Sequence, residues 1–238
     1  MIRVFADNQA LSQAAAELFA EQARQAVASR GRFCVALAGG STPQTCYQLL
    51  AQPPVREQVP WEKVHIFWGD ERCVPLTDPR SNAGMAKTAL LDRVPIPAGQ
   101  IYPMACIEDP ETAARDYQRL LKNFFRPAEP RFDLILLGLG EDGHTASLIP
   151  GTSAPQERID LVTSLQKPGE DFARLSLTAP QINLARMVVF LVSGQGKALS
   201  LRRVLNGPPA QIPAQLIAPR RGELLWLVDR EAAGAESF

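Results

Sequence analysis

Uninterrupted apolar runs alternate with amphipathic stretches along the whole chain. Runs such as FCVALAGG at 33–40 and FDLILLGLG at 132–140 lack the polar alternation of half-exposed strands, and they are typical of strands buried on both faces of a parallel sheet. Between these runs, apolar residues recur at three- and four-residue spacing, which predicts amphipathic helices. The expected strands are 2–5, 33–40, 64–71, 132–140, 186–194 and 223–229, and the expected helices are 11–31, 43–50, 81–91, 110–125 and 197–207.

The alternation of strands and helices predicts one α/β domain over residues 1–238, with a mostly parallel twisted sheet and helices on both of its faces. No internal repeat marks a second domain. Ligands of such sheets bind beyond the carboxyl ends of the strands. Four expected strands end in polar or glycine-rich segments, AGGSTP, WGDER, GLGEDGH and SGQGK, which we expect to lie along one edge of the sheet.

The charges of the chain balance, because 25 Lys and Arg residues stand against 25 Asp and Glu residues. This balance gives no support to nucleic-acid binding or to a membrane-surface role, so an anionic ligand would be held by a few placed cations or helix ends. The chain has no apolar run of 18 residues, and its N-terminus lacks a secretory pattern. We therefore expect a soluble, cytoplasmic protein without a membrane span.

The four cysteines, at positions 34, 46, 73 and 106, are scattered and form no C-x-x-C pair. This spacing argues against a zinc site and against a disulfide framework, and it favours a reducing compartment. Covalent catalysis also lacks a signature. No G-x-S-x-G elbow is present, and neither Cys34 nor Cys46 lies near an obvious base in the sequence.

The segment 138–143 matches the dinucleotide-binding pattern G-x-G-x-x-G and follows an expected strand. A dinucleotide loop opens a helix whose amides meet the pyrophosphate. Here Pro150 would cut such a helix short, and Glu141 and Asp142 would place negative charge beside the phosphates. A catalytic loop around His144 is the favoured interpretation, and a plain glycine-rich turn is the alternative.

His144 is a neutral-range proton carrier at an expected strand end, and either Asp70 or Asp142 could orient it. Arg72, in GDER, could clamp an anion or stabilise an oxyanion, although an ion pair within a solvated turn would also explain it. His65 alternates within the apolar run VHIFW and is expected to be structural.

The segment AGGSTP at 38–43 is the favoured phosphate site. Its glycines allow close backbone approach, Ser41 and Thr42 offer hydroxyls, and Pro43 is expected to open a helix whose free amides point at the loop. Lys197 begins another expected helix, where a cation opposes the helix dipole unless an anion offsets it. The alternatives are an ordinary helix start and a solvated lysine.

Longer segments of the chain resemble the 6-phosphogluconolactonases, in the order and spacing of that family. They are LAGGSTPQTCYQLL, VHIFWGDERCVPLTDPRSNAGMAKTALL, FDLILLGLGEDGHTASLIPG, RLSLTAPQINLARMVVFLVSGQGKA and PAQLIAPRRGELLWLVDREAA. The most specific pieces are DERCVP, the SN pair and GEDGHTASLIPG. Two small departures, LAGG where a serine often precedes the glycines and LIP where LFP is commoner, remove no polar group assigned to chemistry.

The resemblance implies hydrolysis of 6-phospho-D-glucono-1,5-lactone to 6-phosphogluconate, the second step of the oxidative pentose phosphate pathway, on a fold akin to the glucosamine-6-phosphate deaminases. It implies a small sugar-phosphate lactone as ligand, with no cofactor, no required metal and no obligate protein partner. By motif position, the expected catalytic residues are His144, Asp70 and Arg72, and the expected binding residues are Gly40, Ser41, Thr42, Asn82, Asp142, Arg174 and Lys197.

The alternatives to lactone hydrolysis are a deaminase, a dehydrogenase and a sugar-phosphate sensor. A glucosamine-6-phosphate deaminase would carry a glutamate five residues after the histidine, where this chain has Ile149. A dehydrogenase would bind NAD(P) at 138–143, and a non-catalytic sugar-phosphate sensor would bind its ligand without turning it over. The apolar residue at 149 favours the lactonase over the deaminase.

Overall fold

The computed structural model describes residues 1–106 and 109–234 of the chain. Its centre is a six-stranded sheet in which every pair of neighbouring strands is parallel. The strand order across this sheet, with bounds, is β1 (Ile2–Phe5), β9 (Glu223–Asp229), β8 (Met187–Val192), β5 (Leu134–Leu137), β2 (Phe33–Leu37) and β3 (Val64–Trp68).

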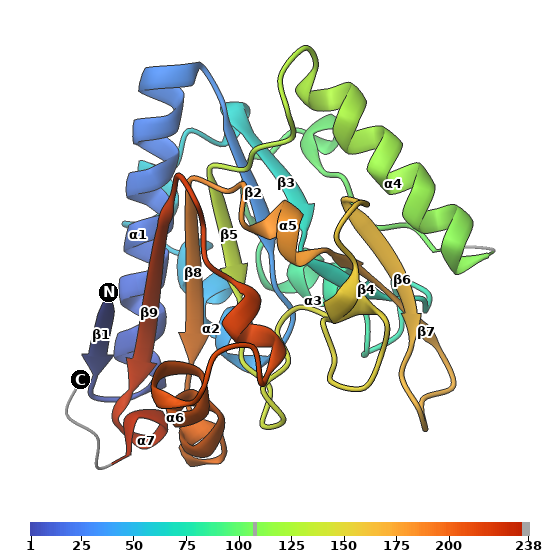
Figure 1. Cartoon of the computed structure of the whole chain (residues 1–238). Coiled ribbons are helices and arrows are strands. Elements are labelled where there is room, and N and C mark those ends of the chain that lie inside the picture. The colour runs from blue at the N-terminus through green and yellow to red at the C-terminus, as the bar shows by residue number, and fades with distance from the viewer. Residues whose placement is uncertain (107–108, 235–238) are drawn as a thin grey trace.

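Helices flank this sheet, as the alternating pattern predicts (Figure 1). The first two helices pack against each other, and the first also packs against β2, β8 and β9. The helices are α1 (Asn8–Arg30), α2 (Ser41–Leu50), α3 (Asn82–Ala89), α4 (Pro110–Phe125), α5 (Ala179–Ile182), α6 (Ala198–Asn206) and α7 (Arg230–Ala233). Within residues 1–106 and 109–234, none of the helices has the length and apolar composition that a membrane span requires.

The core lies on both faces of the central strands, because every residue of β2, β5 and β8 is buried. Phe67 of β3 stacks on Tyr102 and meets Phe124 of α4 edge-on, with ring centroids 4.7 Å and 5.2 Å apart. Burying each such side chain stabilises the fold by about 1.5–3 kcal/mol. His65 belongs to this aromatic cluster, with Nδ1 3.4 Å from Tyr102 Oη, in agreement with the structural interpretation.

The run 64–71, expected as one strand, is divided between two sheets. β3 ends at Trp68, and the backbone of Gly69 joins the sheets, because its N–H donates to Leu37 O and its carbonyl accepts from Leu177 N, both at 2.8 Å. The next residues form β4 (Asp70–Arg72) in a second, antiparallel sheet. Its other strands are β7 (Ala173–Leu177) and β6 (Val162–Gln166). The apolar run predicts that these residues are buried. It does not predict that the chain passes from one sheet to the other at Gly69.

The start of α2 also differs from expectation, since the helix begins at Ser41 and not at Pro43. Proline is tolerated throughout the first turn, where its missing N–H would have no intrahelical partner. Other helix starts follow the expected capping. Ser81 Oγ accepts from Gly84 N at the start of α3, and Asp109 accepts from Thr112 N at the start of α4.

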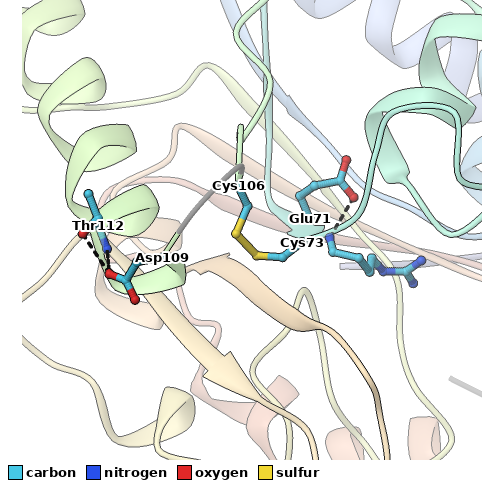
Figure 2. The surroundings of a disulfide bond; sticks show 6 residues. Glu71, Cys73, Cys106, Asp109 and Thr112 are labelled. Carbon is cyan, nitrogen blue, oxygen red and sulfur yellow. Dashed lines mark hydrogen bonds between the residues drawn. A yellow bond between two sulfur atoms is a disulfide. The ribbon is translucent and has the colours of Figure 1, made fainter.

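The expectation that the chain has no disulfide is wrong. Cys73 and Cys106 are bonded, with their Cα atoms 5.0 Å apart, although 33 positions separate them in the sequence (Figure 2). The fold brings them together, so their spacing carried no signal. Cys34 and Cys46 are free buried thiols, and burial raises the pKa of each to about 12.

Candidate active site

One cavity of about 510 Å³ lies beyond the carboxyl ends of β2, β3, β5 and β8. The chain leaves β2 toward β3 on one side, whereas β5 leads to β8 on the other, so the cavity lies where the strand order reverses. Ligands of open parallel sheets bind at this point. All ten residues expected from the sequence line it, namely Gly40, Ser41, Thr42, Asp70, Arg72, Asn82, Asp142, His144, Arg174 and Lys197.

His144 is held by Asp142 through two contacts. Its Nδ1 lies 2.5 Å from Asp142 Oδ1, and its backbone N–H donates to the same oxygen at 3.0 Å. Partial burial raises the pKa of Asp142, but the hydrogen bonds and the charge of His144 outweigh it, so this pKa lies below its ordinary value. The ionised carboxylate only accepts, so it favours the proton on Nδ1 of the neutral ring and leaves Nε2 as the basic nitrogen.

Gly140 makes this contact possible. A Cβ at this position would lie 2.1 Å from His144 Nδ1 and 2.6 Å from Asp142 Oδ1. Gly143 has a φ of 85° and donates to Gly140 O at 3.0 Å, which closes the turn. No helix begins within 138–151, so the dinucleotide alternative lacks the helix N-terminus it needs.

Among the described residues, the acid bonded to the histidine ring is Asp142, whereas Asp70 has other partners. Asp70 is a buried residue, 6% exposed, and its carboxylate accepts from Ser147 Oγ at 2.7 Å and from Asn82 Nδ2 at 3.3 Å. Ser147 was not singled out from the sequence, because a serine in a loop has no distinguishing pattern. Its bond to Asp70 joins the loop that bears His144 to the strand that bears Arg72.

Glu71, between the two predicted residues of β4, has a structural function. Alternate residues of a strand point to opposite faces. Its buried carboxylate accepts from the backbone N–H groups of Asn82 and Ala83, both at 2.7 Å, and so caps α3. Burial raises the pKa of Glu71, against the opposing effect of these hydrogen bonds. The cap places Asn82 at the cavity, where its Oδ1 would lie 1.8 Å from a Cβ at position 39, now glycine.

The loop 38–40 and the N-terminus of α2 that follows it line the cavity. Gly40 has a φ of 103°, a conformation that favours glycine, and no side chain caps the helix. The first hydrogen bond of the helix runs from Gln44 N to Gly40 O at 3.1 Å. The backbone N–H groups of Ser41 and Thr42 therefore have no acceptor within the helix. Such amides, with the helix dipole behind them, form an anion site.

Three cationic side chains line the cavity, in different settings. Lys197 follows β8 and precedes α6, and within the described chain its ammonium group has no ion pair. Arg174 is paired with Glu170, by bonds of 2.7 Å from Nε and 2.6 Å from Nη2. The bonds from Arg174 lower the pKa of Glu170. This partner was not foreseen, because its position in the hairpin turn 167–172 carries no pattern.

Arg72 lies directly opposite Arg174 in the register of β4 and β7. Like charges at such a pair are unfavourable unless a counter-charge is present. Glu170 supplies one, and Arg72 Nη1 donates to the carbonyl of Arg80 at 2.5 Å. Arg72 Nε is buried without a partner among the described residues. The arrangement therefore suits an anionic ligand.

Comparisons with known proteins show the family of the chain. The family model described as "Glucosamine-6-phosphate isomerases/6-phosphogluconolactonase" matches residues 6–226. The 6-phosphogluconolactonase of Synechocystis sp. is 44% identical over 97% of this chain and 96% of that protein. The corresponding protein of Rattus norvegicus is 36% identical over 98% and 92% of the two chains.

Solved structures of similar proteins have the same fold. A 6-phosphogluconolactonase from Trypanosoma brucei superposes with a TM-score of 0.86 at 29% identity, over 98% of this chain and 97% of that one. A monomeric glucosamine-6-phosphate deaminase shares the fold, with a TM-score of 0.82 at 23% identity, over 98% of each chain. The chain belongs to the family of glucosamine-6-phosphate isomerases and 6-phosphogluconolactonases, and its curated relatives place it among the lactonases.

Proposed function

We propose that this enzyme hydrolyses 6-phospho-D-glucono-1,5-lactone to 6-phosphogluconate, the second step of the oxidative pentose phosphate pathway. The observation that carries the proposal is the Asp142–His144 pair, which shares one cavity with the uncapped start of α2. A proton carrier and an anion site in one cavity are what hydrolysis of a phosphorylated lactone requires.

The substrate phosphate docks on the amides of Ser41 and Thr42, next to Gly40. Lys197 offsets its charge, and Arg174 contributes the guanidinium edge that Glu170 leaves open. Charge-assisted bonds of this kind hold a phosphate firmly. Anchoring the phosphate places the lactone carbonyl beside His144, and this positioning lowers the barrier of the chemical step.

His144 Nε2 removes a proton from a water molecule, whose oxygen attacks the lactone carbonyl carbon. Asp142 stabilises the imidazolium that forms, and Arg72 stabilises the negative charge on the carbonyl oxygen. The tetrahedral intermediate then breaks its bond to the ring oxygen, which takes the proton back from His144. General acid–base help of this kind contributes roughly 10²–10⁴ in rate.

Asp70 and Asn82 keep the two halves of the site together. Asp70 binds Ser147 from the loop that bears His144 and Asn82 from the start of α3. It also lies two residues before Arg72 in β4. We therefore assign Asp70 to positioning the oxyanion group relative to His144. From the sequence, Asp70 was expected among the catalytic residues, as one of two acids that could orient His144.

The enzyme acts in the cytoplasm on a small molecule, without a cofactor, a metal, a nucleic acid or an obligate protein partner. The zero net charge supports the absence of a nucleic-acid partner. Among the side chains described, no group of three or more His, Cys, Asp and Glu residues is arranged to hold a metal ion.

The main alternative is the deaminase reaction, and one residue distinguishes it from lactone hydrolysis. Ile149, where the deaminases carry a glutamate, is buried and apolar, so it supplies no carboxylate near the histidine. The test offers the purified enzyme both substrates. Lactone hydrolysis is measured against the spontaneous rate, and ammonia release is measured from glucosamine 6-phosphate. We expect only the first reaction, and ammonia release without lactone hydrolysis would overturn the proposal.

A further inference from the structure

The Cys73–Cys106 disulfide is attached directly to the active site. Cys73 follows Arg72 at the end of β4, and Cys106 lies three residues before Asp109, which caps α4 (Figure 2). The bond fastens the residue after Arg72 to the segment before Cys106, in which Tyr102 N donates to Ile66 O of β3 at 2.8 Å.

Other contacts also hold the chain after Arg72, because Val74 N donates to Arg72 O at 2.8 Å and Arg80 pairs with Asp78 and Asp171. Cys73 N donates to Ala173 O at 2.8 Å, and the residues at 75–77 are exposed. The segment returns to the site at Arg80, whose carbonyl accepts from Arg72 Nη1. The disulfide thus holds one end of a surface loop whose other end is bound by the Arg72 guanidinium itself.

The four cysteines fall into two chemical classes. Cys34 and Cys46 are buried, and their high pKa values keep them as unreactive thiols. Cys73 and Cys106 are only half-buried, unlike the two free thiols. Disulfides of cytoplasmic proteins, when present, are usually transient and redox-sensing. The Cys73–Cys106 disulfide adjoins Arg72, but it has no role in the proposed mechanism of hydrolysis.

We propose that the Cys73–Cys106 disulfide is a redox-modifiable positioning element of the active site, which holds Arg72 for catalysis when oxidised and releases it when a dithiol reduces the bond. One thiolate of the dithiol attacks a sulfur of the pair, and the mixed disulfide that forms is resolved by its second thiolate. The products are two protein thiols and the oxidised dithiol, so two electrons and two protons pass to the protein. The inference rests on the proposed function, because its readout is lactone hydrolysis.

The test compares the oxidised enzyme with the same enzyme reduced by dithiothreitol. Thiol titration after denaturation defines the two states, because four cysteines with one disulfide give two free thiols and full reduction gives four. We expect reduction to lower kcat by about fivefold or more, with a smaller change in KM, since Arg72 acts on the oxyanion. Reoxidation with hydroxyethyl disulfide should restore kcat.

The double variant C73S/C106S is the matched control. It should show the kcat of the reduced enzyme and should not respond to dithiothreitol. An active oxidised enzyme whose kcat is unchanged by full reduction overturns the inference alone. Loss of the far-ultraviolet circular dichroism on reduction also overturns it, because the bond would then be a structural staple. An oxidised enzyme without lactone hydrolysis overturns the proposed function, and the inference with it.

Discussion

The carboxylate of Asp142 accepts both the ring and the backbone N–H of His144, which lies only two positions further along the chain. The contact fixes the ring within one tight turn, so the orientation of His144 depends on the local loop and not on a distant strand. Gly140 must lack a side chain for this turn to form.

Replacing the orienting acid, Asp142→Asn, should lower kcat by about 10²–10⁴-fold. An amide donates where the carboxylate accepted, so it favours the wrong tautomer of His144 and cannot stabilise the imidazolium. Steady-state kinetics on the lactone measures the effect. Asp116→Asn, on the exposed surface of α4, is the control and should behave like the wild type. Equal loss in both variants would contradict the role of Asp142.

The contact between Asp142 and His144 should make the free energy of unfolding depend on pH in the acid range. The folded-state pKa of Asp142 lies below its ordinary value of 3.8, so its contribution to the free energy of unfolding is fully present above pH 3.8 and is lost as pH falls through the folded pKa. Urea unfolding of the wild type and Asp142→Asn should therefore differ more at pH 7 than at pH 3. A difference that grows toward pH 3 would contradict this sign.

Adding one methyl group at Gly140 should damage catalysis more than folding. In Gly140→Ala the new Cβ would overlap His144 Nδ1, so the ring must move, and a displacement of about 1 Å can cost about 10²-fold in rate. Gly138→Ala, in the same loop, is the control because no atom lies within 4 Å of the added Cβ. The prediction fails if the two variants have the same kcat.

Removing the ammonium group of Lys197 should weaken binding and spare the chemical step. A lost charge-assisted hydrogen bond costs about 1.5–3 kcal/mol, which corresponds to about a 10- to 150-fold rise in KM for Lys197→Met. The Kd of the product 6-phosphogluconate, measured by calorimetry, should rise by a similar factor. A lower kcat with unchanged KM and Kd would place Lys197 at the reacting carbonyl and remove it from the phosphate site.

The parallel sheet could be predicted from the sequence because its strands are buried on both faces and therefore read as apolar runs. The second sheet could not, since β4 has only three residues and β6 and β7 mix polar and apolar positions. The change of sheet at Gly69 depends on backbone hydrogen bonds to Leu37 and Leu177, which are distant in the sequence.

The lining of the candidate site could be predicted because strand ends of a parallel sheet meet at one edge. Among the internal contacts of the site, the pair of Asp142 and His144 was one of two expected alternatives, but other partners could not be predicted. Ser147 contacts Asp70 across 77 positions, and Glu170 pairs with Arg174 through a hairpin turn that no pattern indicated. The Cys73–Cys106 bond was missed for the same reason, because pairing of distant residues is decided by the fold.

The role of His144 as the general base is tested by lactone hydrolysis in His144→Ala, corrected for the spontaneous reaction, together with binding of 6-phosphogluconate. We expect kcat to fall by about 10²–10⁴-fold, because the general base is removed. We expect an unchanged Kd for the product, because the phosphate site at Ser41, Thr42 and Lys197 is intact. Wild-type hydrolysis in this variant would contradict the assignment of His144 as the base.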